Sequence, residues 1–257
     1  MMRNNLKKMA RTHLKNAFRR DPPSGLSEAR NDNEAVSAGR IQRGGVTKPQ
    51  PRRRKRSRKG IFEMGSEYVI GIDEVGRGPL AGPVTVCAAA VRRGTKFAPL
   101  ENGVRLDDSK KLSAKSREAW AKKLKGAGVA FAIASVTPAV IDRINVSRAA
   151  DLAAERCLAK LAEDKGISVK HSAIFLDGGL HAGGGKTIVR ADQKITAVKA
   201  ASVLAKVHRD ALMKKLSKKY PAYGFEKHKG YGTKIHLAAI KKHGLSPVHR
   251  KTFCRFA

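Results

Sequence analysis

Residues 67–91 of the chain read EYVIGIDEVGRGPLAGPVTVCAAAV, and this stretch decides the fold. Residues 67–73 form a short apolar run that ends in acids, which predicts a strand. A glycine-rich turn follows directly at residues 76–78. Residues 81–91 are rich in small and β-branched side chains, which predicts a second strand. Two adjacent carboxylates, Asp73 and Glu74, are therefore expected where a buried strand gives way to a turn.

The rest of the chain alternates strand and helix patterns. Short apolar runs predict strands at residues 129–136 and 173–176. Helical spacing of apolar residues predicts long helices at 147–163 and 195–216, with a further helix near 233–243. Small residues share one face of the second long helix and would allow close packing on a sheet: Ala197, Ala200, Ala201 and Ala205. This interleaving predicts an α/β fold with a mixed sheet.

The 257-residue chain is strongly basic, with 54 Lys and Arg against 21 Asp and Glu and a formal net charge of +33. Such an excess of positive charge indicates a polyanionic partner, for which nucleic acid is the leading candidate. No apolar run approaches the ~20 residues that a membrane-spanning helix needs, so we expect no membrane partner. The cysteines Cys87, Cys157 and Cys254 are odd in number and far apart, which favours a reducing compartment and a cytoplasmic location over a disulfide scaffold.

The positive charge is unevenly distributed along the chain. Residues 1–60 hold 18 Lys and Arg against 4 Asp and Glu, and they include the block PRRRKRSRKG at residues 51–60. This segment lacks apolar periodicity beyond its opening residues, so we expect a disordered basic tail that tethers the protein to nucleic-acid backbone. An organelle transit peptide, or a start codon assigned too far upstream, would also account for such a segment.

Four carboxylates follow apolar segments of the chain. Asp73 and Glu74 end the first segment, Asp177 ends AIFLD, and Asp192 follows the apolar patch within TIVRADQ at residues 187–193. If these segments converge, the carboxylates repel one another unless cations bind between them. Oxygen ligands of this kind select Mg²⁺ or Mn²⁺, and two such ions ~4 Å apart support in-line displacement at phosphorus. A competing interpretation is that Asp73 or Glu74 accepts hydrogen bonds from the following turn. A basic chain with an acidic pocket is then a candidate phosphodiesterase.

At these residues the chain closely resembles bacterial ribonuclease HII. The matching blocks occur in order: GIDEVGRGPLAGPV at 71–84, LDDSKKLS at 106–113, IDRIN at 141–145, LDG at 176–178, AASVLAKVHRD at 200–210, YGFEKHKGYGT at 223–233 and HRKTF at 249–253. The resemblance covers residues 66–253 and none of the first sixty. It implies a ribonuclease H-like mixed sheet flanked by helices, which forms a catalytic domain at residues 61–257 with a helical C-terminal extension from about residue 211 onward.

The resemblance also implies an activity. Members of this family are endoribonucleases that hydrolyse the RNA strand of RNA–DNA hybrids and incise duplex DNA on the 5′ side of embedded ribonucleotides. A two-metal reaction would leave 5′-phosphate and 3′-hydroxyl ends, and its use would be ribonucleotide removal in DNA replication and repair. The implied partners are RNA–DNA hybrid and ribonucleotide-containing DNA duplex, and we expect a monomer.

The resemblance maps functional residues onto this chain. Its four catalytic and metal-binding acids correspond to Asp73, Glu74, Asp177 and Asp192, with Mn²⁺ or Mg²⁺ as the cofactor. Its ribonucleotide sensor corresponds to Gly76, Arg77 and Gly78, and its sugar-contacting tyrosine to Tyr231. Ribonuclease HIII, a relative, usually has Glu at the fourth acid and a different glycine motif, so Asp192 and the GRG sequence favour type HII.

Several lysines near these motifs are candidates for phosphate contacts. We select Lys206 and Lys229 as substrate-binding residues ahead of Lys110, Lys111 and Lys227. We expect Ser109 or Ser113 to cap the helix that follows Lys111. Structural rather than chemical roles are expected for Asp142, Asn145 and His228.

The sequence departs from the family pattern at three places. Ala191 precedes the fourth acid where glycine is common, and Gly232 follows Tyr231 where proline is common. The chain also ends at Ala257, soon after HRKTF, where relatives often continue. None of these departures removes a functional group, although a shorter C-terminus could lower affinity for the hybrid.

Two other functions fit part of the sequence. A DNA-structure nuclease on the same fold, such as a resolvase, would need the acids but not the GRG turn and Tyr231, so Arg77→Ala would leave its substrate preference unchanged. A non-enzymatic basic protein, ribosomal or chromatin-associated, fits the composition but not the four carboxylates, which would weaken phosphate binding without metal. Under that hypothesis Asp73→Asn would preserve or improve function.

Overall fold

The computed structural model describes residues 67–256, so the expected tail at residues 1–60 lies outside the described residues. Five strands form one sheet in the order β3-β2-β1-β4-β5. Their bounds are β1 Tyr68–Val75, β2 Val84–Arg92, β3 Ala130–Val136, β4 Ala173–Asp177 and β5 Lys186–Ile188. Strand β2 pairs antiparallel with β1 and β3, whereas β4 pairs parallel with β1 and β5. The predicted mixed sheet is confirmed.

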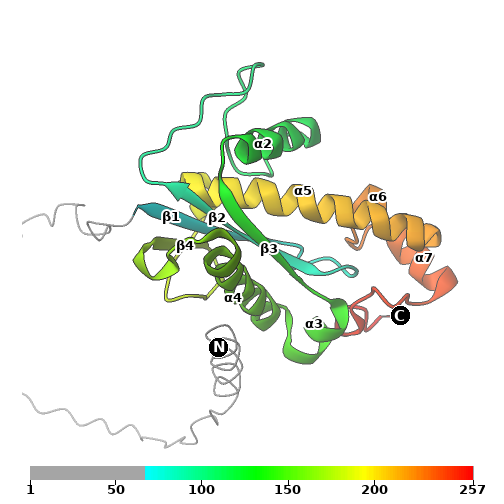
Figure 1. Cartoon of the computed structure of the whole chain (residues 1–257). Helices are drawn as coiled ribbons and strands as arrows, with labels where there is room; N and C mark the ends of the chain where they lie inside the picture. The colour runs from blue at the N-terminus through cyan, green and yellow to red at the C-terminus, as the bar shows by residue number, and fades with distance from the viewer. Residues whose placement is uncertain (1–66, 257) are drawn as a thin grey trace, which may run out of the picture. The chain divides into compact units, whose positions relative to one another are not determined.

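Helices cover both faces of this sheet, which lies between α4 and α5 in Figure 1, with α2 on the outer side of α5. The α-helices are α2 Ala114–Gly126, α3 Pro138–Ile144, α4 Val146–Lys165, α5 Thr196–Lys219, α6 Phe225–His228 and α7 Lys234–His243. Four short 3-10 turns join them: η1 Val169–His171, η2 Ala191–Gln193, η3 Pro221–Tyr223 and η4 Lys251–Phe253. The flanking helices that the sequence predicts are therefore confirmed.

Helix α4 packs on one face of the sheet because its apolar residues recur at helical spacing. Its buried side chains, among them Ala153, Cys157 and Leu161, join Ile70 and Ile72 of β1 in the larger hydrophobic cluster. Asn145 starts the helix by accepting the N–H of Arg148 at 3.0 Å, which confirms the structural role expected for it.

Helix α5 packs on the opposite face, and its small-residue face explains how closely it approaches. The four alanines at positions 197, 200, 201 and 205 are buried, as the sequence predicts. Gly71 of β1 lies beneath the first turn of α5, where a β-carbon on Gly71 would stand 2.1 Å from the carbonyl carbon of Ala197. Trp120 and Leu124 of α2 complete this second hydrophobic cluster from outside.

Several element boundaries differ from those predicted. Strand β1 continues to Val75, so Asp73 and Glu74 lie inside the strand and pair with Cys87 and Val86 of β2. Strand β2 begins at Val84 rather than residue 81, because Gly82 has a φ of +86° and Pro83 has no N–H for the ladder. Strand β5 was not predicted, since its three residues depend on pairing with β4.

The C-terminal part of the chain is helical, as expected. Helices α6 and α7 follow α5 and pack at its end around a small cluster of Ala81, Met213, Tyr223, Phe225 and Ile240. Residue 211, where we expected the extension to begin, lies inside the continuous helix α5. No helix among residues 67–256 is long and apolar enough to cross a membrane.

Candidate active site

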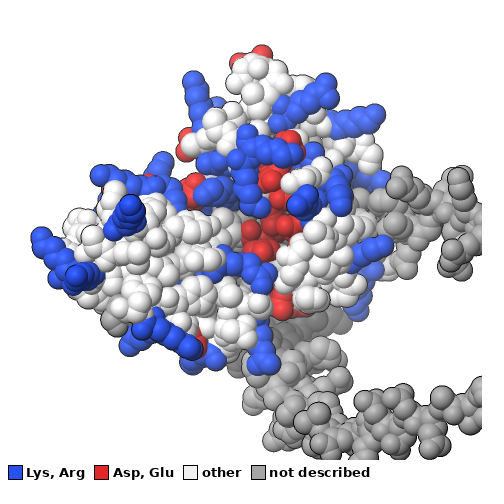
Figure 2. Space-filling model, turned by 180° about the vertical axis from the view of Figure 1, so that it is seen from behind, with Lys and Arg blue, Asp and Glu red and all other residues white. Residues whose placement is uncertain are grey.

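The four predicted acids come from three neighbouring elements. Asp73 and Glu74 lie near the end of β1, and Asp177 is the last residue of the adjacent parallel strand β4. Ile72 pairs with Leu176, so Asp73 and Asp177 follow at the same level of the sheet. Asp192 lies in η2, just before α5. Figure 2 shows carboxylates in a strip on one face of the molecule, with Lys and Arg around it.

Asp177 fixes the position of the fourth acid. Its Oδ1 accepts the backbone N–H of Ala191 at 2.7 Å and that of Asp192 at 3.5 Å. Ala191 is fully buried, and the left-handed conformation falls on Arg190, with φ of +56°, rather than on Ala191. The chain therefore accommodates alanine before the fourth acid without placing it in a backbone conformation that favours glycine.

Burial, and to a smaller extent the neighbouring acids, raise the pKa values of three of the four carboxyl groups. Burial raises the pKa of Asp73 well above its usual value, and the charges of Glu74, Asp177 and Asp192 raise it further. Burial also raises the pKa of Glu74, against the lowering effect of Arg77. The pKa of Asp192 is raised by burial and then by the charges of Asp177 and another acid, Asp108. The four carboxylates are thus electrostatically coupled, as a shared site requires.

The donor set fits a hard divalent cation. All four candidate ligands are carboxylates, and Oε2 of Glu74 is buried without a hydrogen-bond partner. Successive strand residues face opposite sides of the sheet, so Asp73 points toward α5 and Glu74 toward α4. Both lie, with Asp177, at the C-terminal end of the parallel strands β1 and β4. Among residues 67–256 no three His, Cys, Asp or Glu side chains are already arranged as a cage for a metal ion.

The GRG turn leads away from Glu74 and is held by Arg77. The guanidinium of Arg77 donates to Glu74 Oε1 at 3.4 Å, to the carbonyl oxygen of Gly179 at 3.3 Å and to Ser147 Oγ at 2.7 Å. These contacts connect the turn to the acids and to the loop that follows Asp177. Gly76 has a φ of +91°, and a β-carbon there would stand 2.2 Å from Nε of Arg209. A side chain at this position is therefore disfavoured both by the backbone conformation and by the clash with Arg209.

Tyr231 lies beside the turn. A β-carbon on Gly78 would stand 3.8 Å from Cε1 of the Tyr231 ring, and the side chain of Tyr231 is 46% exposed. The carbonyl oxygen of Gly230 accepts the N–H groups of Leu80 and Ala81, which fastens the Tyr231 loop to the end of the GRG turn. The ring is therefore presented to solvent rather than used for packing.

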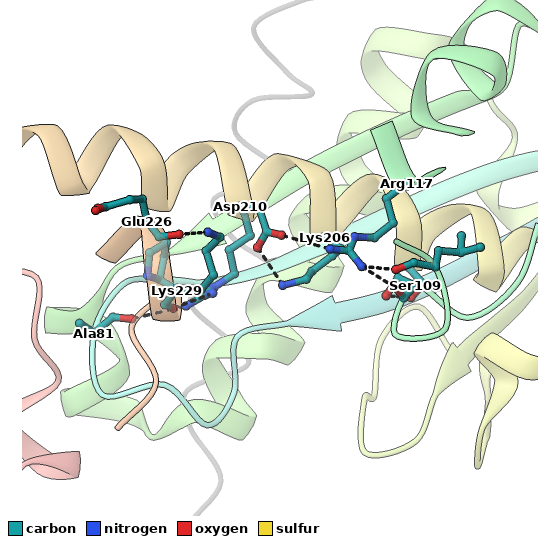
Figure 3. Close-up of polar contacts among 11 residues, drawn as sticks. Ala81, Ser109, Arg117, Lys206, Asp210, Glu226 and Lys229 are labelled. Carbon is teal, nitrogen blue, oxygen red and sulfur yellow. Dashed lines mark hydrogen bonds and ion pairs between the residues drawn. The ribbon is translucent and has the colours of Figure 1, made fainter. Parts of the chain in front are cut away.

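The two selected lysines flank one aspartate on α5 (Figure 3). Lys206 Nζ donates to Asp210 Oδ1 at 2.8 Å, and Arg117 lies 3.8 Å from the other carboxylate oxygen. Lys229 donates to the carbonyl oxygen of Glu226, and burial lowers the pKa of Lys229 against the raising effect of the Asp210 charge. Asp210 thus orients Lys206 directly and acts on Lys229 through its charge.

The loop at residues 107–113 adds groups that sequence reasoning did not assign. Asp108 is only 4% exposed and lies beside Asp192, where its charge helps to raise the pKa of Asp192. Lys110 Nζ lies 3.7 Å from Asp192 Oδ2, whereas Lys111 pairs with Asp107. The paired aspartates in LDDSKKLS were the only sequence signal for Asp108. A fifth acid and a cation therefore border the four.

The remaining expectations concern structural residues. Ser113, rather than Ser109, caps α2 by accepting the N–H of Ser116 at 3.1 Å. Asp142 accepts the N–H of Lys251 at 2.9 Å and that of Thr252 at 3.1 Å, so it anchors the C-terminal turn. Both ring nitrogens of His228 bond to backbone, at Tyr223 and Gly230, which agrees with a structural role. All three cysteines are buried and free.

Comparison with known proteins shows the family to which the chain belongs. The family model of ribonuclease HII matches residues 70–256. The ribonuclease HII of Chlorobium chlorochromatii is 44% identical over 192 residues, covering 73% of this chain and 89% of that protein. The solved ribonuclease H2 of Pyrococcus horikoshii OT3 is 27% identical with a TM-score of 0.56, over 74% of this chain and 96% of that one.

A second solved structure, Bst-RNase HIII in complex with Mn²⁺, supports the fold alone, since it is 22% identical with a TM-score of 0.57 over 75% of this chain and 68% of that one. These likenesses confirm the predicted ribonuclease H-like fold. The chain therefore belongs to the ribonuclease HII family, whose members are metal-dependent nucleases that act on RNA–DNA hybrids.

Proposed function

We propose that this protein incises duplex DNA on the 5′ side of embedded ribonucleotides, and the RNA strand of RNA–DNA hybrids, by two-metal phosphodiester hydrolysis. The products would carry 5′-phosphate and 3′-hydroxyl ends, and the reaction would remove ribonucleotides during DNA replication and repair. The observation that carries the proposal is one arrangement of the GRG turn: Arg77 bonds to Glu74 of the four acids, while Gly78 lies beside Tyr231. The GRG turn and Tyr231, which would recognise the sugar, are thereby connected to the carboxylates, which would support hydrolysis of the adjacent phosphodiester.

Asp73, Glu74, Asp177 and Asp192 would hold the metal ions, Mn²⁺ or Mg²⁺. When bound, these ions would supply the activation of water and the stabilisation of the departing 3′ oxygen. The chain itself contributes oxygen donors whose pKa values are raised at Asp73, Glu74 and Asp192, first by burial and further by the charges of neighbouring acids, so the site would favour a cation that replaces the protons. The Mn²⁺ held by Bst-RNase HIII, on the same fold, is consistent with this assignment.

The GRG turn and Tyr231 would distinguish ribose from deoxyribose. Gly76 and Gly78 carry no β-carbon, so the backbone groups of the turn can approach a 2′-hydroxyl. The guanidinium of Arg77 is already bonded to Glu74, Gly179 and Ser147, so it would orient the turn rather than contact the sugar. The exposed ring of Tyr231 would stack on the neighbouring deoxyribose, where a 2′-hydroxyl would clash.

The decisive test is one cleavage assay. A labelled DNA duplex with a single embedded ribonucleotide should be incised on the 5′ side of that ribonucleotide, with Mn²⁺ or Mg²⁺ and not with chelator. Arg77→Ala should reduce the preference for this duplex over the all-DNA duplex, because the turn loses three anchors. Equal cleavage of the all-DNA duplex by the wild type would favour the resolvase alternative, and binding without any cleavage would favour the non-enzymatic one.

Lys206 and Lys229 would position the duplex through its phosphates. Replacing Lys206 with Ala should weaken binding of every duplex to a similar extent and reduce the slope of log affinity against log salt by about 1. Lys165→Ala is the matched control. Lys165 is exposed at the C-terminal end of α4, whereas Arg77 contacts Ser147 in the first turn of that 20-residue helix, so Lys165 lies far from the proposed substrate-binding residues. Fluorescence anisotropy over a salt series measures both slopes, and an unchanged slope for Lys206→Ala would remove this lysine from the interface.

We further propose that the protein acts as a monomer in the cytoplasm. The three buried free thiols are compatible with a reducing compartment. Light scattering at working concentration would test the oligomeric state.

A further inference from the structure

The block HRKTF near the C-terminus has no task in the function proposed above, yet its first two residues are buried. Arg250 is 0% exposed and His249 is 3% exposed. A guanidinium is expensive to bury unless its donors are satisfied. The partners of these two side chains therefore indicate why the fold keeps them inside.

Arg250 donates hydrogen bonds to the backbone of the GRG turn. Its Nη2 donates to the carbonyl oxygen of Gly76 at 2.5 Å and its Nη1 to that of Arg77 at 2.6 Å. Its Nε donates to the carbonyl oxygen of Gly82 at 3.0 Å. One planar group thus holds two carbonyl groups of the turn together with that of Gly82, a geometry that the rigid fork of arginine provides and the single ammonium of lysine does not.

His249 connects to Tyr231 through a second histidine, His236. Nδ1 of His249 accepts the N–H of Ser246 at 2.9 Å, so its Nε2 carries the proton and donates to Nε2 of His236 at 3.0 Å. Nδ1 of His236 then carries the other proton and donates to the carbonyl oxygen of Tyr231 at 2.9 Å. A single arrangement of protons satisfies the whole chain of hydrogen bonds, and it ends on the residue that would contact the sugar.

Backbone contacts fix these two neighbours against the turn. Arg250 N donates to the carbonyl oxygen of Leu80 at 2.8 Å, and Gly82 N donates to that of Val248 at 2.8 Å. Arg209, also fully buried, supports the same junction from α5: it donates to the carbonyl oxygens of Ala81, Pro83 and Lys229. Figure 3 labels Ala81 and Lys229, two of the residues whose carbonyl oxygens accept hydrogen bonds from Arg209.

We propose that His249 and Arg250 are positioning residues that set the spacing between the GRG turn and Tyr231, and thereby the preference for a ribonucleotide followed by a deoxyribonucleotide. This inference rests on the proposed function, because it assigns the sugar contacts to those two elements. Both side chains are buried, so neither would touch substrate. Arg250 holds the GRG turn and its neighbour His249 holds Tyr231 through His236, so the two side chains together fix the distance between the turn and the tyrosine. Small displacements of a positioned group have large effects on reaction rates.

The test compares Arg250→Lys and His249→Phe with the wild type. Lysine keeps the charge but loses the fork, and phenylalanine keeps a ring beside Tyr223 and Phe225 but loses the donor to His236. Arg255→Lys is the matched control, since Arg255 is exposed in the same segment. The measured quantity is kcat/KM on a duplex with one ribonucleotide divided by kcat/KM on a uniform RNA–DNA hybrid. The fraction of active enzyme cancels in this ratio, so a purely structural role would not change it.

We expect the ratio to fall about 10-fold or more in both variants and to stay at the wild-type value in Arg255→Lys. A folded Arg250→Lys enzyme with the wild-type ratio would overturn the inference, and so would a folded His249→Phe enzyme with that ratio if the arginine variant does not fold. Failure of the proposed function would look different, because the wild type itself would then show no metal-dependent incision at the ribonucleotide.

Discussion

Asp73→Asn is expected to abolish cleavage, lowering the single-turnover rate by about 1,000-fold or more, while binding of RNA–DNA hybrid survives. Asp73 is buried near the end of β1, and its pKa is raised by burial and by the charges of the other three acids. The amide keeps the size and shape of the side chain but removes an anionic oxygen donor from the site. Rapid-quench cleavage and anisotropy on the same hybrid, each with Mn²⁺, measure the two effects separately.

The same variant should be more stable than the wild type when no divalent ion is present. The pKa of Asp73 is raised in the fold above its value of 3.8 in the unfolded chain, mainly by burial. The protonated Asp73 carboxyl is compatible with the fold, whereas burial disfavours the ionised carboxylate. The free energy of unfolding therefore falls as the pH rises from 3.8 through the raised pKa of Asp73, and the ionised group destabilises the fold at higher pH. Asp73→Asn removes this cost at neutral pH. Mn²⁺ should then raise the Tm of the wild type more than that of the variant, by mass action.

Asp164→Asn is the matched control, because Asp164 is exposed on α4. It should leave cleavage, binding and the response of Tm to Mn²⁺ as they are in the wild type. If Asp73→Asn cleaves normally, the acids of β1 do not carry the chemistry. If it loses hybrid binding together with cleavage, Asp73 has a structural role and the metal assignment is weakened.

Local pattern was sufficient to predict the elements that carry the fold. The alanine face of α5 and the apolar spacing of α4 depend only on residues within one helix, and both faces are buried as expected. Strand β5 could not be found in this way, because three residues become a strand only when β4 lies beside them. The end of β1 was misplaced for the same reason, since the length of β2 decides how far the ladder continues past Asp73.

The site was predictable in its residue types but not in its supporting contacts. Acids that follow apolar runs are conspicuous in a chain with few acids, so Asp73, Asp177 and Asp192 could be selected from the sequence. Arg209 and Arg250 could not, because nothing local distinguishes a buried arginine from the many exposed ones in so basic a chain. Their function depends on carbonyl groups more than a hundred residues away along the chain.

Gly71→Ala is expected to destabilise the protein by about 3 kcal/mol or more, as overpacking against main chain does at its upper end. Gly71 lies in the middle of β1, where alanine would ordinarily be preferred by about 0.5–1 kcal/mol. Here a β-carbon would stand 2.1 Å from the carbonyl carbon of Ala197 and 2.2 Å from the N of Val198. Those atoms belong to the backbone of α5, so no side chain can rotate away, and the helix itself has to move.

Movement of α5 would also disturb catalysis, because the helix begins four residues after Asp192 and carries Lys206. Urea unfolding measures the stability, with Gly126→Ala as the matched control: Gly126 ends α2, and a β-carbon there would meet nothing within 4 Å. That control should be unchanged or up to about 1 kcal/mol more stable, since alanine favours helix over glycine. Equal stability of Gly71→Ala and the wild type would mean that α5 does not approach β1 closely, and the four acids would then lack the support that holds Asp192 near Asp177.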